Sequence, residues 1–120
     1  MKDVTSRVPM PRIFRALSDE TRLRILHLLR EGELCVGDLV KILRLPQAKT
    51  SRHLAYLRNA RLVSVRANGK WSFYALARAT DSVSSRLDEL LQVGLKTVPG
   101  TAADARRAAK IRKEGGCCPK

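Results

Sequence analysis

Three cysteines are the residues of this chain best suited to bind a metal or to be oxidised. Cys35 stands alone, whereas Cys117 and Cys118 are adjacent near the end of the sequence. The first ten residues, MKDVTSRVPM, contain no apolar segment of the signal-peptide kind, so a cytoplasmic location is expected. In a reducing compartment, cysteines serve as thiols or metal ligands more often than as structural disulfides.

A second group of candidates lies in residues 46–61, PQAKTSRHLAYLRNAR, whose pattern predicts one helix. Pro46 suits the first turn, where its missing N–H costs nothing. Leu54, Leu57 and Ala60 recur at helical spacing and are expected to face the core. The rest of the helix is mostly polar or basic and contains no acidic residue. Such a surface is typical of a helix that enters the major groove of DNA.

Two runs of alternating apolar and polar residues follow in residues 62–76, LVSVRANGKWSFYAL. They are joined through Asn68-Gly69, the strongest short sequence signal for a β-hairpin. Arg66 and Lys70 make the hairpin basic. A polar helix followed by a basic hairpin is the plan of a winged helix-turn-helix, in which the hairpin lies against the flanking DNA backbone. The alternative is a solvated charged helix beside an ordinary hairpin.

The distribution of charge favours a polyanionic partner. The 120 residues include 24 Lys plus Arg and 11 Asp plus Glu, which gives a net charge of +13. No carboxylate lies between Asp38 and Asp81, although that stretch contains nine basic residues. Nucleic acid and an anionic membrane surface both fit such a charge. Because no apolar run approaches the ~20 residues needed to span a bilayer, we expect double-stranded DNA as the partner and no membrane.

The remaining segments predict the elements that position these groups. Helices are expected over residues 10–17, 18–32, about 36–43 and 81–98, which together with the hairpin give a mainly α fold. Residues 1–98 would form the DNA-binding and dimerisation domain. Residues 99–120 would form a basic tail that ends in Cys-Cys. Within that tail, a short helix from residue 102 to 113 and a disordered segment are both open, because it has little apolar surface to bury.

An apolar stripe on the last helix of the domain predicts self-association. Val83, Leu87, Leu90, Leu91 and Leu95 recur at helical spacing. A stripe of this kind is too apolar for a terminal helix to leave exposed. It would pack on the first helix, on a second subunit, or on both, and we expect a homodimer packed through its first and last helices. Two copies of the helix over residues 46–61, the recognition helix, would then lie roughly 34 Å apart on a palindromic DNA site.

Four segments resemble the ArsR/SmtB family of metal- and metalloid-responsive repressors: ALSDETRLRILHLL, GELCVGDLV, QAKTSRHLAYLRNARLV and VRANGKWSFYAL. The resemblance covers about residues 10–95. It implies a winged helix-turn-helix homodimer that binds a palindromic operator and releases it when an inducer binds. An enzyme is not expected, because the two histidines have no evident carboxylate or nucleophile arrangement and no glycine-rich phosphate loop is present.

The sequence departs from the family pattern at two places. Arg61 replaces the glycine that usually follows the recognition helix, where a left-handed residue is favoured. In the segment ELCVGDLV, Gly37 and Val40 occupy the positions of two of the three family cysteines, and only Cys35 remains. The family's other metal site, built from carboxylates and histidines on the last helix, has no match, because that helix contains no histidine.

The resemblance, together with the remaining cysteines, gives a specific hypothesis. Three thiolates suit a trigonal soft ion, so the expected inducer is trivalent arsenic or antimony, with no organic cofactor. Its expected ligands are Cys35, Cys117 and Cys118. Two alternatives stay open: a thiol-based sensor of oxidants or sulfur species, and an architectural DNA-binding protein that needs no inducer.

The expected DNA contacts fall into two classes. Residues at or near the start of the recognition helix are expected to reach base edges or adjacent phosphates: Gln47, Thr50, Ser51 and His53. Basic residues along the helix and on the hairpin are expected mainly to contact phosphates: Lys49, Arg52, Arg58, Arg66 and Lys70. His53 has a second possible role, packing the recognition helix against its support.

Overall fold

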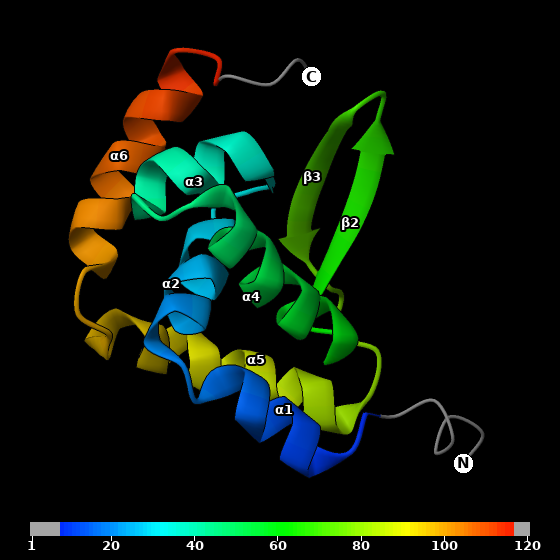
Figure 1. Ribbon diagram of the computed structural model, residues 1–120. Helices are drawn as coiled ribbons and strands as arrows, with labels where there is room; N and C mark the ends of the chain where they lie inside the picture. The colour runs from blue at the N-terminus through cyan, green and yellow to red at the C-terminus, as the bar shows by residue number, and fades with distance from the viewer. Residues whose placement is uncertain (1–7, 117–120) are drawn as a thin grey trace.

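The computed structural model describes residues 8–116, and these residues form a winged helix-turn-helix (Figure 1). The elements in chain order are α1 (Met10–Leu17), α2 (Glu20–Leu29), β1 (Leu34–Cys35), α3 (Val36–Leu43), α4 (Gln47–Asn59), β2 (Val63–Asn68), β3 (Trp71–Leu76), α5 (Ser82–Gly94), a 3-10 turn (Leu95–Thr97) and α6 (Thr101–Lys113). The predicted fold class is therefore confirmed. None of the helices in this part of the chain is long and apolar enough to cross a membrane.

Local capping explains where the helices begin. The Asp19 side chain accepts the backbone N–H of Arg22 at 3.0 Å, so α2 starts one residue later, at Glu20. Asp81 and Ser84 form a capping box at the start of α5. The predicted bounds of α1 and α3 agree with the structure, whereas α2 and α5 are shorter than predicted and α5 continues into the 3-10 turn.

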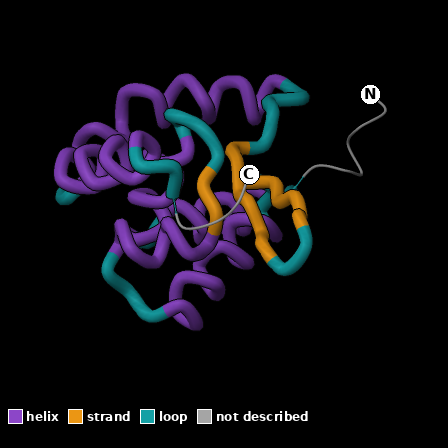
Figure 2. Tube along the Cα trace, turned by 90° about the horizontal axis from the view of Figure 1, so that it is seen from above, coloured by secondary structure: helices purple, strands orange, loops and turns teal. Residues whose placement is uncertain are grey.

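The wing is a hairpin of β2 and β3, and β1 extends it into a three-stranded antiparallel sheet in the order β1-β3-β2. Asn68 pairs with Trp71, so the two-residue loop is Gly69-Lys70 and not Asn68-Gly69. Gly69 has φ 64°, a left-handed conformation that the tight turn requires. Seen from above, the strands gather on one side of the helical body (Figure 2).

The core lies where α2, α3 and α4 meet. Leu26 of α2, Leu39 and Ile42 of α3, and Leu54 and Leu57 of α4 are all at most 1 % exposed. The predicted core face of the recognition helix is thus confirmed. Its opposite face is left on the surface, where it is available to a partner.

The segment after Pro99 forms α6, which packs against α2 and α3 (Figure 1). Asp104 is fully buried and accepts hydrogen bonds from Arg24 Nε and Nη2, each at 2.8 Å, and from Arg107 Nη2 at 2.9 Å. Arg107 Nε also donates to the Ile42 carbonyl at 2.9 Å. Of the two alternatives for this segment, the structure therefore shows the helix, and ion pairs as well as apolar contacts attach it to the domain.

Arg61 adopts the left-handed backbone conformation that favours glycine, the residue that the resemblance leads us to expect at this position. Its φ is 59°, and Arg44 at the end of α3 has a similar φ of 57°. A side chain with a Cβ costs about 1–2 kcal/mol in this region. The arginine found here in the sequence thus has a left-handed backbone, which places strain at residue 61.

Relief of this strain gives a testable prediction. Arg61→Gly is expected to be more stable than Arg61→Ala by about 1 kcal/mol, because both variants lack the guanidinium and only alanine keeps the Cβ. Urea unfolding of the two variants measures the difference directly. Equal free energies of unfolding would contradict a strained backbone at this position.

Candidate nucleic-acid interface and thiol site

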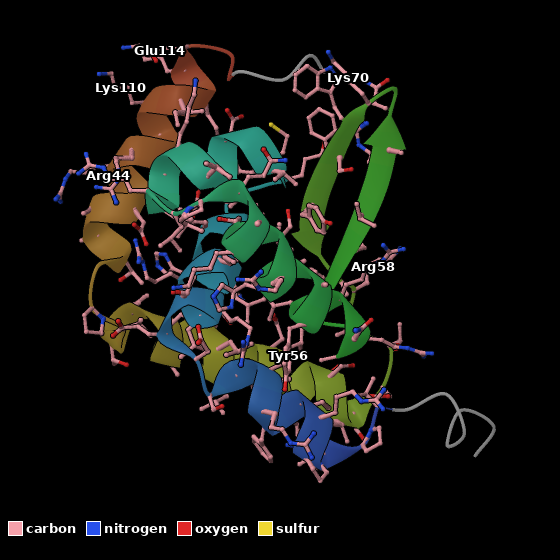
Figure 3. The ribbon with its side chains drawn as sticks, in the orientation of Figure 1. Arg44, Tyr56, Arg58, Lys70, Lys110 and Glu114 are labelled. Carbon is pink, nitrogen blue, oxygen red and sulfur yellow. The ribbon has the colours of Figure 1, made fainter. Side chains whose placement is uncertain are left out.

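Most of the candidate DNA-binding residues lie on one exposed surface. All nine fall within residues 8–116, and seven of them are exposed: Gln47, Lys49, Ser51, Arg52 and Arg58 on α4, and Arg66 and Lys70 on the wing. Figure 3 shows Arg58 beside the far end of α4 and Lys70 at the tip of the wing. The exposed residues on this helix and wing include no carboxylate, so the surface presents positive charge and hydrogen-bond donors.

Thr50 does not belong to this surface. Its side chain is 0 % exposed, and Oγ1 donates to the Pro46 carbonyl at 3.1 Å. The hydroxyl therefore makes a hydrogen bond within the first turn of α4, on the buried side of the helix. The prediction that Thr50 reaches base edges is corrected accordingly, since a side chain with no accessible surface cannot contact DNA without unwinding that turn.

His53 is half-buried between α4 and the start of α2. Its Nδ1 lies 3.3 Å from Nη1 of Arg22 and 3.9 Å from Oδ1 of Asp19. Arg22 also donates to the carbonyls of Ala16 and Arg15, and its guanidinium lies 4.1 Å from the centre of the Tyr56 ring. His53 thus joins the recognition helix to a polar cluster that fixes its orientation, which agrees with the packing role.

The surroundings of His53 make the fold sensitive to pH. Burial lowers the pKa of His53 below its ordinary value of 6.5, the cations Arg22, Lys49 and Arg52 lower it further, and Asp19 opposes them. The unfolded chain therefore takes up a proton at a pH where the folded protein does not. Stability is consequently expected to fall as the pH drops below 6.5 towards the lowered pKa.

We expect His53→Gln to reduce this loss of stability. The free energy of unfolding should decrease less in the variant than in the natural protein between about pH 7.5 and about pH 5.5. Urea unfolding at the two pH values measures both decreases. Identical decreases would show that His53 is not the group responsible.

Arg66 is held by a carboxylate that sequence reasoning did not identify. Its Nη2 donates to Oε1 of Glu33 at 2.6 Å, and its Nε donates to Oε2 at 3.1 Å. The guanidinium also lies 4.4 Å from the centre of the Phe73 ring. The hydrogen bonds that Arg66 donates to Glu33 raise the pKa of Arg66. When DNA is absent, Arg66 is therefore already hydrogen-bonded to a side chain of its own chain.

Cys35 occupies a structurally important position. It is 1 % exposed, ends β1 and forms the N-cap of α3, the helix that supports α4. It is disulfide-bonded in this structure and is the one cysteine among residues 8–116. The other two predicted ligands, Cys117 and Cys118, lie outside the described residues. Within the described residues, no group of three His, Cys, Asp or Glu side chains could hold a metal ion.

The end of α6 lies next to Cys35. Gly116 and Cys35 line the same small cavity, together with Asp38 and Phe73. Gly116 has φ 74°, and a Cβ at this position would lie 2.5 Å from Oδ2 of Asp38, so glycine is required. Arg112 Nη2 donates to the Gly32 carbonyl at 2.7 Å and helps to hold the end of α6 here. The residue that precedes Cys117 is thus placed beside the start of α3.

Comparison with known proteins identifies relatives of this arrangement. Residues 19–65 match the arsR family of bacterial regulatory proteins. The arsenic resistance transcriptional regulator ArsR2 of Pseudomonas putida is 41% identical over 95 residues, which cover 78% of this chain and 80% of that protein. The arsenical resistance operon repressor of Escherichia coli K12 is 53% identical over 66 residues, 54% of this chain and 56% of that repressor. The match therefore spans only a little over half the length of the latter.

Solved structures give the same family. HlyU from Vibrio cholerae superposes with a TM-score of 0.60 and 32% identity, covering 78% of this chain and 98% of that one, and it is also known in a reduced form. The matched residues 19–65 include α2, α3 and α4, the helices that form the core of this chain. This chain therefore belongs to the ArsR family of bacterial regulatory proteins, whose named relatives are transcriptional regulators and not enzymes.

Proposed function

We propose that this chain is a transcriptional repressor that leaves its operator when trivalent arsenic or antimony binds its thiols. The observation that carries the proposal is the position of Cys35, which caps the helix supporting the recognition helix and lies beside the end of α6. Any bond formed at this cysteine acts directly on the helix-turn-helix. The names of ArsR2 and the Escherichia coli repressor support arsenic as the inducer.

The exposed face of α4 would enter the major groove. Gln47 and Ser51 lie near its N-terminus, where side chains reach base edges. Lys49, Arg52 and Arg58 along the helix, with Arg66 and Lys70 on the wing, would contact phosphates and set the register of the protein on DNA. His53 would act indirectly, by holding α4 against α2.

A phosphate role for Lys70 predicts a specific change in salt dependence. Lys70→Ala should weaken binding to operator and random DNA alike, and the slope of log K against log salt should flatten by about one unit. Lys110→Ala is the matched control, because it removes the same charge from the exposed face of α6, away from the wing (Figure 3). If the two variants have equal slopes, Lys70 does not contact phosphate and is not part of the DNA interface.

We further propose that a second copy of the chain covers the exposed apolar side chains of α1 and α5. No residue of α5 is fully buried, and Leu90 and Val93 are 58% and 65% exposed. Phe14 of α1 is 52% exposed. A groove of about 600 Å³ between the starts of these two helices is lined by apolar side chains, including Met10 and Val83, and by polar ones such as Arg78 and Asp81. A homodimer formed here would present two recognition helices to a palindrome.

The thiol chemistry fits a soft trigonal ion. Sulfur ligands select soft ions over magnesium or calcium, and only the deprotonated thiolate binds. Cys35, Cys117 and Cys118 would supply three ligands, and the bound ion would link the start of α3 to the end of the chain. Because Cys35 is disulfide-bonded in this structure, it must be reduced before it can act as a ligand. Binding should also weaken as the pH falls.

A second candidate function is supported by the same cysteine. A thiol in this position also suits a repressor that responds to oxidants or sulfur species, since thiolates are readily oxidised. The likeness to HlyU, which is known in a reduced form, is consistent with that alternative. The two functions share the DNA surface and differ only in the chemistry at sulfur.

One experiment separates the candidates. The reduced protein is bound to operator DNA without oxygen and treated either with arsenite or with peroxide. Release by arsenite alone supports the metalloid repressor, whereas release by peroxide alone supports the redox sensor. Equal binding to operator and random sequences, with no release by either reagent, would instead identify an architectural DNA-binding protein.

A further inference from the structure

Cys35, Phe73 and Arg66 form one row across the sheet. Cys35 pairs with Phe73 between β1 and β3, and Phe73 pairs with Arg66 between β3 and β2. Directly opposed residues of antiparallel strands point to the same face, so these three side chains are neighbours. Phe73 is 2% exposed and packs with Cys35, while the Arg66 guanidinium lies 4.4 Å from the Phe73 ring centre.

Glu33 connects the two ends of this row, because it is hydrogen-bonded to Arg66 and lies close to Cys35 in the sequence. It precedes Cys35 by two residues, and its carboxylate reaches over β3 to accept hydrogen bonds from Nε and Nη2 of Arg66. The cysteine and the carboxylate therefore belong to the same short segment before α3. Any displacement of that segment changes the position of Glu33 as well as the packing of Phe73.

We propose that Glu33 competes with DNA phosphate for Arg66, and that Phe73 couples this competition to the state of Cys35. The proposal rests on the proposed function, because it takes Arg66 as a phosphate contact of the wing. Glu33 is then an autoinhibitory residue, and Phe73 is a positioning residue.

The chemistry of the guanidinium explains the competition. Its planar fork binds a carboxylate or a phosphate through two parallel hydrogen bonds, and Glu33 occupies the edge formed by Nε and Nη2, so a phosphate that takes this edge must displace Glu33. The Glu33–Arg66 pair is weak enough to be displaced, because the two side chains are 36% and 48% exposed. A phosphate bound through the Nε and Nη2 edge breaks this pair, so the strength of the pair then sets part of the affinity for the operator. A shift at Cys35 that moves Phe73 would alter the stacking of Arg66 and change that strength.

The test compares two carboxylates of the same segment. Glu33→Gln is expected to tighten operator binding by up to about fivefold relative to Glu31→Gln at the same salt concentration. Glu31 is the matched control because it is exposed and its substitution removes the same charge two residues away. In an Arg66→Ala background, the difference between the two glutamine variants should vanish. Equal affinities of the two single variants, or a difference that persists without Arg66, would overturn the competition.

A second measurement tests the coupling without DNA. The Nε–Hε resonance of Arg66 in a ¹⁵N spectrum, assigned by its loss in Arg66→Ala, should move when the Cys35 disulfide is reduced. In Phe73→Leu the movement should fall by at least half. A resonance that stays in place on reduction of the unsubstituted protein, or one that moves equally in Phe73→Leu, would overturn the coupling. Failure of the natural protein to bind any operator would refute the proposed function and leave this spectroscopic result valid.

Discussion

Replacing Leu90 by glutamate is expected to convert the proposed homodimer into monomers and to lower operator affinity by at least about 100-fold, because each monomer then engages a single half-site. Leu90 is 58% exposed in the single chain, so the new carboxylate meets water there and the fold of the monomer should survive. In the dimer the same carboxylate would be buried against apolar side chains without a partner. Sedimentation at micromolar concentration measures the state of association, and circular dichroism checks the fold.

Gln92→Glu provides the control, because it adds the same charge at an exposed position of the same helix. Leu91 is a less suitable probe, since it packs partly against the core of its own chain and a charge there would destabilise the monomer. If Leu90→Glu sediments as a dimer, the apolar face of α5 is not the interface. The two-fold arrangement proposed here would then have to be abandoned.

Asp104→Ala is expected to destabilise the protein by about 3 kcal/mol, because it removes the buried partner of two arginines. The carboxylate is 0% exposed, while Arg24 and Arg107 are 20% and 29% exposed. When Asp104 is removed, both arginine side chains can turn partly towards water. The expected loss of stability is therefore at the lower end of the range for breaking a buried ion pair, about 3–5 kcal/mol. For a domain of this size, a decrease of roughly 10 °C in the melting temperature should follow.

The surface pair of Asp88 with Arg30 is the matched comparison. Asp88 is 53% exposed and lies 3.1 Å from the Arg30 guanidinium, so Asp88→Ala should cost less than about 1 kcal/mol. Both variants are unfolded by heat at the same protein concentration. Similar melting temperatures for the two variants would mean that Asp104 does not attach α6 to the domain.

Much of the fold could be predicted because its signals are local. The helical spacing of Leu54 and Leu57, the proline before α4 and the Asn68-Gly69 pair all act within a few residues of where they stand. The positions of α1, α3 and the hairpin follow from such signals. The exposed polar face of α4 also follows, since it is the complement of a predicted core face.

The rest depends on contacts between distant parts of the chain. Asp104 meets Arg24, which lies 80 residues earlier, so nothing near Asp104 in the sequence indicates that α6 will pack. The strand β1 is only two residues long and is defined by its pairing with β3. The pairing of Glu33 with Arg66 likewise requires the sheet to be formed first.

Thr50 shows a different limit of sequence reasoning. A hydroxyl near the start of a helix can point to solvent or bond to the carbonyl four residues earlier, and the residue type alone does not decide between them. Thr50 lies on the same face of α4 as the buried Leu54, and its hydroxyl donates to the Pro46 carbonyl. One of the nine residues predicted to contact DNA is therefore buried inside the domain.

We have proposed that a trivalent metalloid binds Cys35 and thereby causes the repressor to leave its operator. The most direct measurement follows the fluorescence anisotropy of labelled operator DNA while arsenite is added to the reduced natural protein and, in parallel, to Cys35→Ser. We expect arsenite to weaken operator binding of the natural protein by about 5- to 150-fold, the range of a typical coupling, and to leave Cys35→Ser bound. If arsenite fails to release the natural protein, or releases both proteins equally, Cys35 is not the site through which a metalloid controls DNA binding.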